Sequence, residues 1–265
     1  MNGLLVYDTI GAKRNGWFIE KLTGEFERAG IVLRLCITDG KKAVAAEGID
    51  FAIVRTIAPE INGGLERAGI KTFNNYITSS VANDKWETYL LCEKLGIPVM
   101  PTYENVEQAD KFPCIIKSCN GHGGTEVFRA ENRDELIERQ NFFKSAGKKF
   151  IVQKYCSDPG RDMRVYVMGG KIIASVLRYN PDSFKSNFSL GGKARLASPD
   201  ASQVEAVEKI AARLKSDYIG VDFIFNDGRW VLNEIEDVVG SRMLYEVTDI
   251  DVAAEYCSYI LGAMR

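Results

Sequence analysis

The stretch that most constrains the fold is residues 112–127, FPCIIKSCNGHGGTEV, where an apolar run ends on Lys117 and enters a glycine-dense turn. A strand that brings a lysine to a loop with Gly121, Gly123 and Gly124 predicts a phosphate site. The ammonium and the unhindered backbone N–H groups can then approach the same oxygens. No Gly-Lys-Ser/Thr follows, which excludes a Walker A loop. By itself the stretch is also compatible with an ordinary turn.

Charge and composition narrow the possible partners. The 265 residues carry 34 Lys and Arg against 36 Asp and Glu, a formal net charge of -2. This balance gives no global field toward nucleic acid or an anionic membrane, so we expect neither partner. No run approaches the ~20 apolar residues that span a bilayer. The first residues lack a basic leader followed by a long apolar core, so we expect a cytoplasmic protein.

Metal ligands of the zinc type are scarce in this sequence. The six cysteines are scattered without a CxxC pair, and His122 is the only histidine. We therefore expect reduced core cysteines and no zinc site. His122 lies inside the glycine loop, where it is either a polar loop residue or a phosphate contact.

The first part of the chain alternates short apolar runs with helical periodicity, which predicts a small parallel α/β domain over residues 1–78. Residues 9–16, TIGAKRNG, are expected to form a loop at the carboxyl end of the first strand, where open α/β sheets place ligands. This loop is read as either a substrate loop or a surface connection. The strands are expected at 3–7, 31–37, 50–54 and 70–73.

The middle of the chain, residues 79–150, is expected to form a second domain. Ser79 or Ser80 is predicted to cap a helix that ends at Gly96. Lys85 falls in the first turns of this helix. A cation there opposes the helix dipole, so Lys85 indicates an anionic partner or is simply solvated.

Residues 151–265 are β-rich and predict a third domain. Two glycine-bearing turns, at 169–170 and 227–228, predict hairpins. Ser202 with Glu205 is expected to start a helix between them, and residues 251–262 a closing helix.

The second informative stretch is the hairpin at 220–236. A three-residue loop at 227–229 would place Asp222 opposite Glu234, with Glu236 on the same face. Three gathered carboxylates repel each other unless a cation lies among them, and oxygen ligands without histidine favour Mg²⁺ or Mn²⁺. The alternative is an exposed acidic hairpin.

A third group, of basic residues, lies along the strands on either side of the 169–170 turn and in the loop that follows them, SFKSNFSLGGKAR. Arginines in strands with apolar neighbours can clamp a carboxylate or a phosphoryl group through bidentate bonds. Edge-strand charges that limit aggregation are the alternative. The four residues are Arg164, Arg178, Lys185 and Arg195.

Several motifs in order resemble the ATP-grasp ligases, most closely the RimK-like amino-acid ligases. They are Asp-Lys-Trp near a helix start, IIKSCNGHGGTEV, VQKY, GRDMRVYVMGGKIIASVLR, FKSNFSLGG, GVDF and NEIE. The resemblance covers residues 80–262. It implies an ATP-grasp fold that is α+β in the grasp part and preceded by a small parallel α/β domain.

The resemblance also implies roles for individual residues. Arg164 and Arg178 would be catalytic and face the reacting carboxylate and its acyl phosphate, while Asp222, Glu234 and Glu236 would hold Mg²⁺ or Mn²⁺. The implied ATP contacts are Lys85 and Lys117 at the phosphates, Gly121, Gly123 and Gly124 in the covering loop, Lys154 and Tyr155 at the adenine, Asp162 near the ribose, and Lys185 and Asn187 beside the γ-phosphate.

The sequence departs from the family pattern at three places. Lys154 stands where the family usually has Glu, which a backbone contact to adenine would tolerate. Glu236 stands where the family usually has Asn, so the metal number or the affinity for an anionic intermediate would change. The segment Asp237-Val238-Val239-Gly240 replaces the family's Ser-Pro-Gly. We therefore expect an unusual substrate end of the cleft.

The resemblance implies an ATP-dependent carboxylate-amine ligase that works through an acyl phosphate. Its substrates would be a small carboxylate and an amine, either free or on a peptide or protein tail. Relatives of this kind are often dimers or tetramers, so a homo-oligomer is compatible with the sequence. The alternatives are a small-molecule kinase of the same fold and a nucleotide-binding regulatory module with little turnover.

Overall fold

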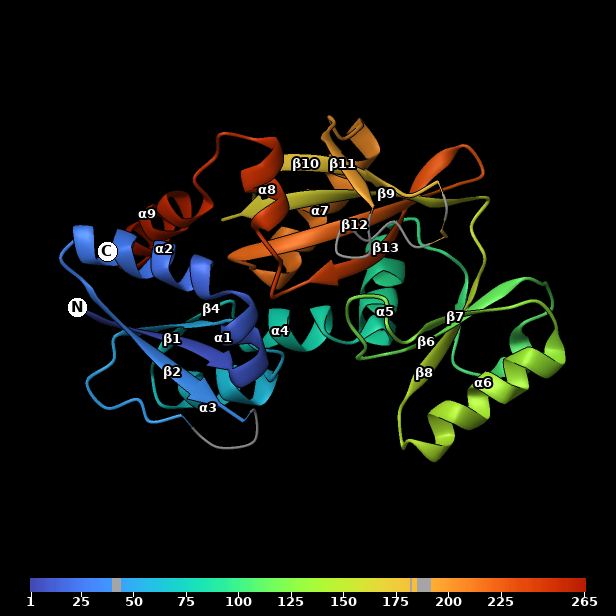
Figure 1. The fold of residues 1–265 in the computed structure, drawn as a ribbon, viewed down its shortest axis with the longest axis horizontal. Coiled ribbons are helices and arrows are strands. Elements are labelled where there is room, and N and C mark those ends of the chain that lie inside the picture. Colours follow the sequence, from blue (N-terminus) through green and yellow to red (C-terminus); the bar gives the residue numbers. More distant parts are fainter. Residues whose placement is uncertain (40–43, 182, 185–191) are drawn as a thin grey trace.

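Three sheets, joined in sequence order, form the computed structural model of the protein (Figure 1). The structure describes residues 1–39, 44–181, 183–184 and 192–265. Two of the predicted nucleotide contacts, Lys185 and Asn187, lie outside the described residues. Within the described part of the chain, no helix combines the length and apolar character that crossing a bilayer requires.

The N-terminal sheet is parallel with the order β2-β1-β3-β4, as the alternation of strands and helices predicts. Successive side chains of its central strand point to opposite faces. Leu5 and Tyr7 pack into one core cluster with residues of α2, and Leu4 and Val6 into another with residues of α3. The elements are β1 (Asn2–Asp8), α2 (Gly16–Arg28), β2 (Val32–Thr38), β3 (Phe51–Val54), α3 (Pro59–Arg67) and β4 (Lys71–Phe73).

The loop expected at residues 9–16 is wrong, because these residues form helix α1 (Thr9–Arg14) and the start of α2. The side chain of Asp8 accepts a hydrogen bond from the backbone N–H of Gly11, at 2.7 Å. This N-cap satisfies an amide that the first turn leaves without a helical partner. The glycines of the segment therefore lie in helices.

Two helices occupy the region where a single helix capped by Ser79 or Ser80 was expected, so that expectation is wrong. α4 (Tyr76–Ala82) begins earlier, with Asn75 as its N-cap. α5 (Lys85–Leu95) is capped by Asp84, whose carboxylate accepts from the amides of Trp86 and Glu87, and it ends at Gly96. The cap fixes Lys85 at the first helical position.

The middle sheet is antiparallel with the order β5-β8-β6-β7, and helix α6 packs on it (Figure 1). Asn132 caps α6, because its Oδ1 accepts from the Glu135 N–H at 3.0 Å, and the Glu135 side chain accepts from the Glu131 N–H at 2.9 Å. The elements are β5 (Thr102–Tyr103), the 3-10 turn η1 (Val106–Gln108), β6 (Cys114–Ser118), β7 (Val127–Ala130), α6 (Arg133–Ser145) and β8 (Phe150–Lys154).

The C-terminal sheet is antiparallel with the order β11-β10-β9-β12-β13. Asp200 and Gln203 form the capping box of α7, so the expected start at Ser202 with Glu205 is wrong. α7 packs on one face of the sheet, and α9 packs against α2 of the N-terminal domain (Figure 1). The elements are β9 (Asp158–Met168), β10 (Lys171–Tyr179), β11 (Lys193–Leu196), α7 (Ala201–Leu214), β12 (Tyr218–Asn226), β13 (Arg229–Glu236), α8 (Arg242–Val247) and α9 (Val252–Ala263).

The hairpin of β12 and β13 places Asp222 opposite Glu234, as predicted, but for a different reason. The turn has two residues, Asp227 and Gly228, both with positive φ, and not three. A β-bulge restores the predicted register because it leaves Asn233 as an extra residue on β13. The expected loop is therefore wrong, while the expected pair of acids is confirmed.

A buried asparagine connects β4 to the C-terminal sheet. Asn74 is 2% exposed, and its Nδ2 donates to Tyr218 O at 2.8 Å and to Asp237 Oδ1 at 2.7 Å. Its Oδ1 accepts from the backbone amides of Asp217 and Tyr218. One side chain thus satisfies four polar groups where three segments meet.

Replacing Asn74 with Ala should destabilise the protein by about 3 kcal/mol, because buried donors and acceptors lose their partners. Urea unfolding would measure the change. Asn141→Ala is the matched control, since Asn141 is an exposed residue of α6. If the two variants unfold at the same urea concentration, the Asn74 network does not contribute as described.

Candidate active site

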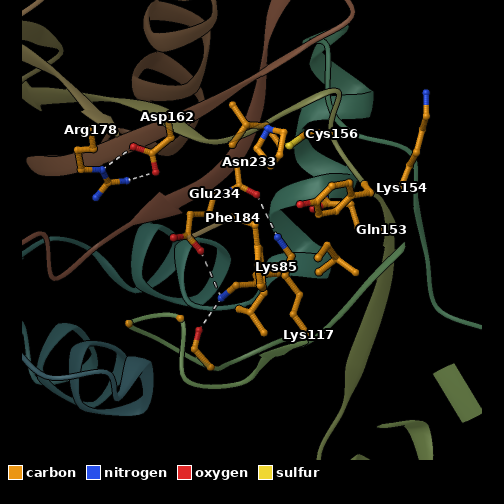
Figure 2. A pocket seen from close by; sticks show the side chains of 18 residues that line it. Lys85, Lys117, Gln153, Lys154, Cys156, Asp162, Arg178, Phe184, Asn233 and Glu234 are labelled. Carbon is orange, nitrogen blue, oxygen red and sulfur yellow. Dashed lines mark hydrogen bonds and ion pairs between the residues drawn. The ribbon is translucent and has the colours of Figure 1, made fainter. Parts of the chain in front are cut away.

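A pocket lies between the middle sheet and the β12–β13 hairpin, with the start of α5 at one side (Figure 2). Ten residues singled out in the sequence line it, although they come from segments far apart in the chain. They are Lys85, Lys117, Gly121, Gly123, Gly124, Lys154, Tyr155, Asp162, Arg178 and Glu234.

Two lysines point into this pocket and reach the hairpin from different elements (Figure 2). Lys117 is the last residue but one of β6, and its Nζ donates to Asn233 Oδ1 at 3.0 Å. Lys85 Nζ donates to Gly121 O at 2.6 Å and lies 3.4 Å from Glu234 Oε2. The ammonium groups, the glycine loop and the acidic hairpin therefore meet at one place, as the sequence predicted.

Burial changes the proton affinity of Lys117. Its side chain is only 4% exposed, and loss of hydration disfavours the charged form. The Glu234 carboxylate partly offsets this effect and the Lys85 ammonium adds to it, so the pKa of Lys117 falls to about 8. Lys117 is thus a cation that titrates slightly above neutral pH.

The glycine loop has the backbone that only glycine adopts readily. Gly123 and Gly124 have φ values of 66° and 73°, in the left-handed region. A Cβ at Gly121 would lie 2.9 Å from Glu126 Oε2. The backbone therefore favours glycine at Gly123 and Gly124, while a side chain at Gly121 would have to displace the end of the Glu126 side chain.

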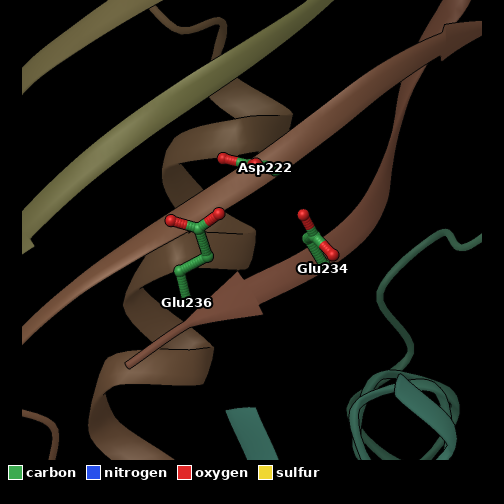
Figure 3. Close-up of side chains that lie close together, drawn as sticks. All are labelled: Asp222, Glu234 and Glu236. Carbon is green, nitrogen blue, oxygen red and sulfur yellow. The ribbon is translucent and has the colours of Figure 1, made fainter. Parts of the chain in front are cut away.

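The three acids of the hairpin gather beside the pocket (Figure 3). One carboxylate oxygen from each of Asp222, Glu234 and Glu236 lies within 4.8 Å of the others. Such a set of oxygen donors fits Mg²⁺, which prefers carboxylates, water and phosphate oxygens. The residues present therefore suit the ion that the family pattern implies.

Two arginines already place positive charge among these acids. Arg164 makes bidentate bonds of 2.7 and 2.6 Å to Asp222 and a third of 2.5 Å to Glu236. Arg178 makes bidentate bonds of 2.6 and 2.7 Å to Asp162, and its Nη2 donates to Asp222 at 2.7 Å. Protein cations alone therefore offset much of the repulsion that the sequence argument assigned to a metal.

These ion pairs dominate the acidity of Asp222. Its burial would raise the pKa, but the two guanidinium groups outweigh that cost and lower the pKa to about 2. The pKa of Glu236 is instead raised, because burial and two neighbouring carboxylates outweigh the attraction of Arg164. The pKa values of Asp222 and Glu236 are therefore shifted in opposite directions.

The predicted adenine residues lie at the other end of the pocket. The Lys154 side chain extends away from the pocket and pairs with Asp227 at 3.5 Å, while its backbone N–H donates to Pro101 O at 3.0 Å (Figure 2). The Tyr155 ring lies under the Arg129 guanidinium, at 4.7 Å. Lys154, which stands where Glu was expected from the family resemblance, therefore lines the pocket while its ammonium points away from it.

Sequence reasoning missed several lining residues. Asn233 contacts Lys117 only because the bulge turns it toward the pocket, and a bulge has no clear sequence signal. Phe184 directly precedes Lys185, a predicted γ-phosphate contact, so its position in the sequence could have indicated that it lines the pocket. The other missed residues are Ile115, Val127, Gln153, Cys156, Pro159 and Ile224.

The fold and the pocket define an ATP-grasp protein. The D-alanine–D-alanine ligase of Bacillus anthracis superposes with a TM-score of 0.78, 16% identity and coverage of 100% of this chain and 97% of that one. The RimK-like ATP-grasp domain matches residues 83–260. The chain therefore belongs to the RimK-like ATP-grasp family.

Two curated relatives extend the comparison. The chain is 34% identical over 183 residues to the uncharacterized protein MG011 of Mycoplasma genitalium, covering 67% of this chain and 63% of that protein. It is 29% identical over 235 residues to the glutamate–LysW ligase ArgX of Sulfolobus acidocaldarius, covering 80% and 81%. The matched region is thus under two thirds of MG011 but most of ArgX.

The titration of Lys117 predicts a pH dependence for nucleotide binding. Above pH 8 the free protein loses this ammonium, so the affinity for the ATP analogue AMPPNP with Mg²⁺ should fall by up to about tenfold per pH unit. Calorimetric titrations from pH 7 to 9 would measure it. Lys117→Met should bind more weakly and lose the pH dependence; an unchanged slope in this variant would assign the titration to another group.

Proposed function

We propose that the protein is an ATP-dependent carboxylate-amine ligase that forms an amide through an acyl phosphate. The observation that carries this proposal is the convergence of Lys85, Lys117 and Glu234 on one pocket, with the carboxylates of Asp222 and Glu236 gathered beside that of Glu234. Membership of the RimK-like ATP-grasp family supports it. ATP and Mg²⁺ are the proposed cofactors.

The proposed reaction has two displacements. An oxygen of the substrate carboxylate attacks the γ-phosphorus of ATP, the bond to the bridging oxygen breaks, and ADP leaves. The amine nitrogen then attacks the acyl carbon, phosphate leaves, and the nitrogen loses a proton. No side-chain nucleophile is needed, so catalysis consists of positioning and charge stabilisation.

The pocket residues have distinct proposed roles. Lys85 and Lys117 bind the nucleotide phosphates, and the glycine loop covers them. Asp222, Glu234 and Glu236 would hold Mg²⁺, which when bound supplies positive charge to the phosphates. Arg164 and Arg178 remain the proposed partners of the reacting carboxylate, although both bind carboxylates of the protein in this structure.

The three-domain division at 1–78, 79–150 and 151–265 remains our proposal. On this division the middle domain supplies Lys117 and the glycine loop, and the last domain supplies the acids. The proposed substrates are an acid and an amine, one of them an amino acid or a peptide tail, as the name of the glutamate–LysW ligase suggests for that relative.

ADP release with a substrate panel tests this function. The protein would be incubated with ATP, Mg²⁺, amino acids and acidic peptides, and ADP and products would be quantified. ADP formation that requires both a carboxylate and an amine supports the ligase. A stable phosphorylated product would instead indicate a small-molecule kinase, and nucleotide binding without ADP would indicate a regulatory module.

Glu234→Gln should reduce ADP formation by at least about 100-fold, because it removes charge from the proposed metal site. Mn²⁺ binding, followed by electron paramagnetic resonance with AMPPNP present, should weaken as well. Glu208→Gln, on the exposed side of α7, is the control. Full activity and unchanged Mn²⁺ binding in the Glu234 variant would refute the metal assignment.

A further inference from the structure

Strand β9 bulges away from its neighbour β12 beside the pocket. The ladder between these strands pairs Ile224 with Asp162, and the next residue of β12 with Asp158. One step along β12 therefore corresponds to four steps along β9, so residues 159–161 bulge out of this ladder. A bulge releases backbone groups from the ladder and lets them bind elsewhere. Gly160 is the middle residue of the bulge.

The bulge is anchored to the β12–β13 hairpin by the side chain of Arg161. Its guanidinium carbon lies 4.5 Å from the ring centroid of Phe225 and 5.6 Å from that of Trp230. A guanidinium at this distance is attracted to the face of an aromatic ring. The backbone of Gly160 is therefore held in place from the hairpin side.

The backbone of Gly160 in turn holds the segment that follows β10. Its N–H donates to Phe184 O at 3.1 Å, and its carbonyl accepts from the Asn180 N–H at 2.8 Å. The second bond extends the β9–β10 register, in which Tyr179 pairs with Arg161, by one residue. One residue thus fixes the segment both where it leaves β10 and at Phe184.

Gly160 has no room for a side chain. Its φ is 76°, in the left-handed region. A Cβ there would lie 2.5 Å from Ser183 O and 2.6 Å from Asn180 O. Both are backbone atoms, so rotation of a neighbouring side chain cannot relieve the collision. With a side chain at position 160, the segment would have to move away from β9.

The residue that Gly160 holds belongs to the candidate active site. Phe184 lines the pocket (Figure 2), and its ring centroid lies 6.3 Å from that of Tyr155, a predicted adenine contact. Aromatic and apolar side chains favour a flat aromatic ligand group such as a purine base. Further apolar lining residues are Ile115, Val127, Pro159 and Ile224.

We propose that Gly160 is a positioning residue for nucleotide binding, which holds Phe184 where its ring contacts the base. This inference rests on the proposed function, because it takes ATP as the ligand of the pocket. Gly160 acts through its two backbone hydrogen bonds and through the absence of a side chain. A segment that is already fixed loses less conformational freedom when the nucleotide binds.

Two glycine variants test this role by calorimetric titration with AMPPNP and Mg²⁺. Gly160→Ala should bind about tenfold or more weakly than the native protein, because the segment that carries Phe184 must move. Gly170→Ala is the matched control. Gly170 lies in the turn at the other end of β9, its φ is 77°, and a Cβ there would meet no described atom within 4 Å.

The control separates the collision from the cost of the backbone conformation. Alanine at a positive φ is destabilising at either position, so both variants should unfold at similarly lowered temperatures. Gly170→Ala should nevertheless keep its AMPPNP affinity within about twofold of the native value, since it moves nothing at the pocket.

A double variant tests whether Gly160 acts through Phe184. Phe184→Ala should also bind AMPPNP about tenfold more weakly, because the base loses its aromatic contact. Gly160→Ala combined with Phe184→Ala should then bind within about twofold of Phe184→Ala alone. Independent effects would instead multiply to about 100-fold.

Four results would overturn the Gly160 assignment. They are equal AMPPNP affinity in the two glycine variants, unchanged affinity in Phe184→Ala, losses that multiply in the double variant, or unfolding of Gly160→Ala far below the temperature of Gly170→Ala. Failure of the native protein to bind AMPPNP at all would instead contradict the proposed function. The two failures are therefore distinguishable.

Discussion

The site depends on the buried carboxylate of Asp222 and the two arginines that bind it. Arg164 from β9 and Arg178 from β10 both donate to Asp222 on β12, so one carboxylate ties three adjacent strands together through their side chains. Removing either arginine would take away one of the two cations that bind the buried Asp222 carboxylate, which is unfavourable in the interior. Among the described residues, the charged network around Asp222 joins four acids to four bases: Asp162, Asp222, Glu234 and Glu236 with Lys85, Lys117, Arg164 and Arg178.

This charge balance gives a physical meaning to the residue that departs from the family pattern. Asn at position 236 would leave the group with one excess positive charge, whereas Glu236 balances it and engages Arg164. The lysines extend the network across the gap between two sheets, since Lys117 bonds Asn233 and Lys85 pairs with Glu234. The protein's own side chains therefore already connect the two walls of the pocket.

The N-terminal parallel sheet packs directly against the C-terminal part of the chain. It shares a core cluster with the C-terminal helices, and the Asn74 side chain completes the hydrogen bonds at the start of β12. Arg55 contacts the segment that replaces the family's Ser-Pro-Gly. Two parts of the chain that are about 180 residues apart in sequence therefore meet just beyond the acidic hairpin.

The sequence by itself determined the parallel N-terminal strands, the helix end at Gly96 and the β12–β13 hairpin, because strand alternation and glycine turns are local signals. It missed α1 and the division between α4 and α5. It also predicted a phosphate site at Lys117 and the glycine loop, and it predicted that Asp222 lies opposite Glu234. Only the tertiary structure decided the hairpin bulge, the Asp84 cap and the partners of the arginines, since each depends on contacts between distant segments. A sequence states which charges are present, but the low-dielectric interior, which makes an unpaired charge costly, decides which of them must pair.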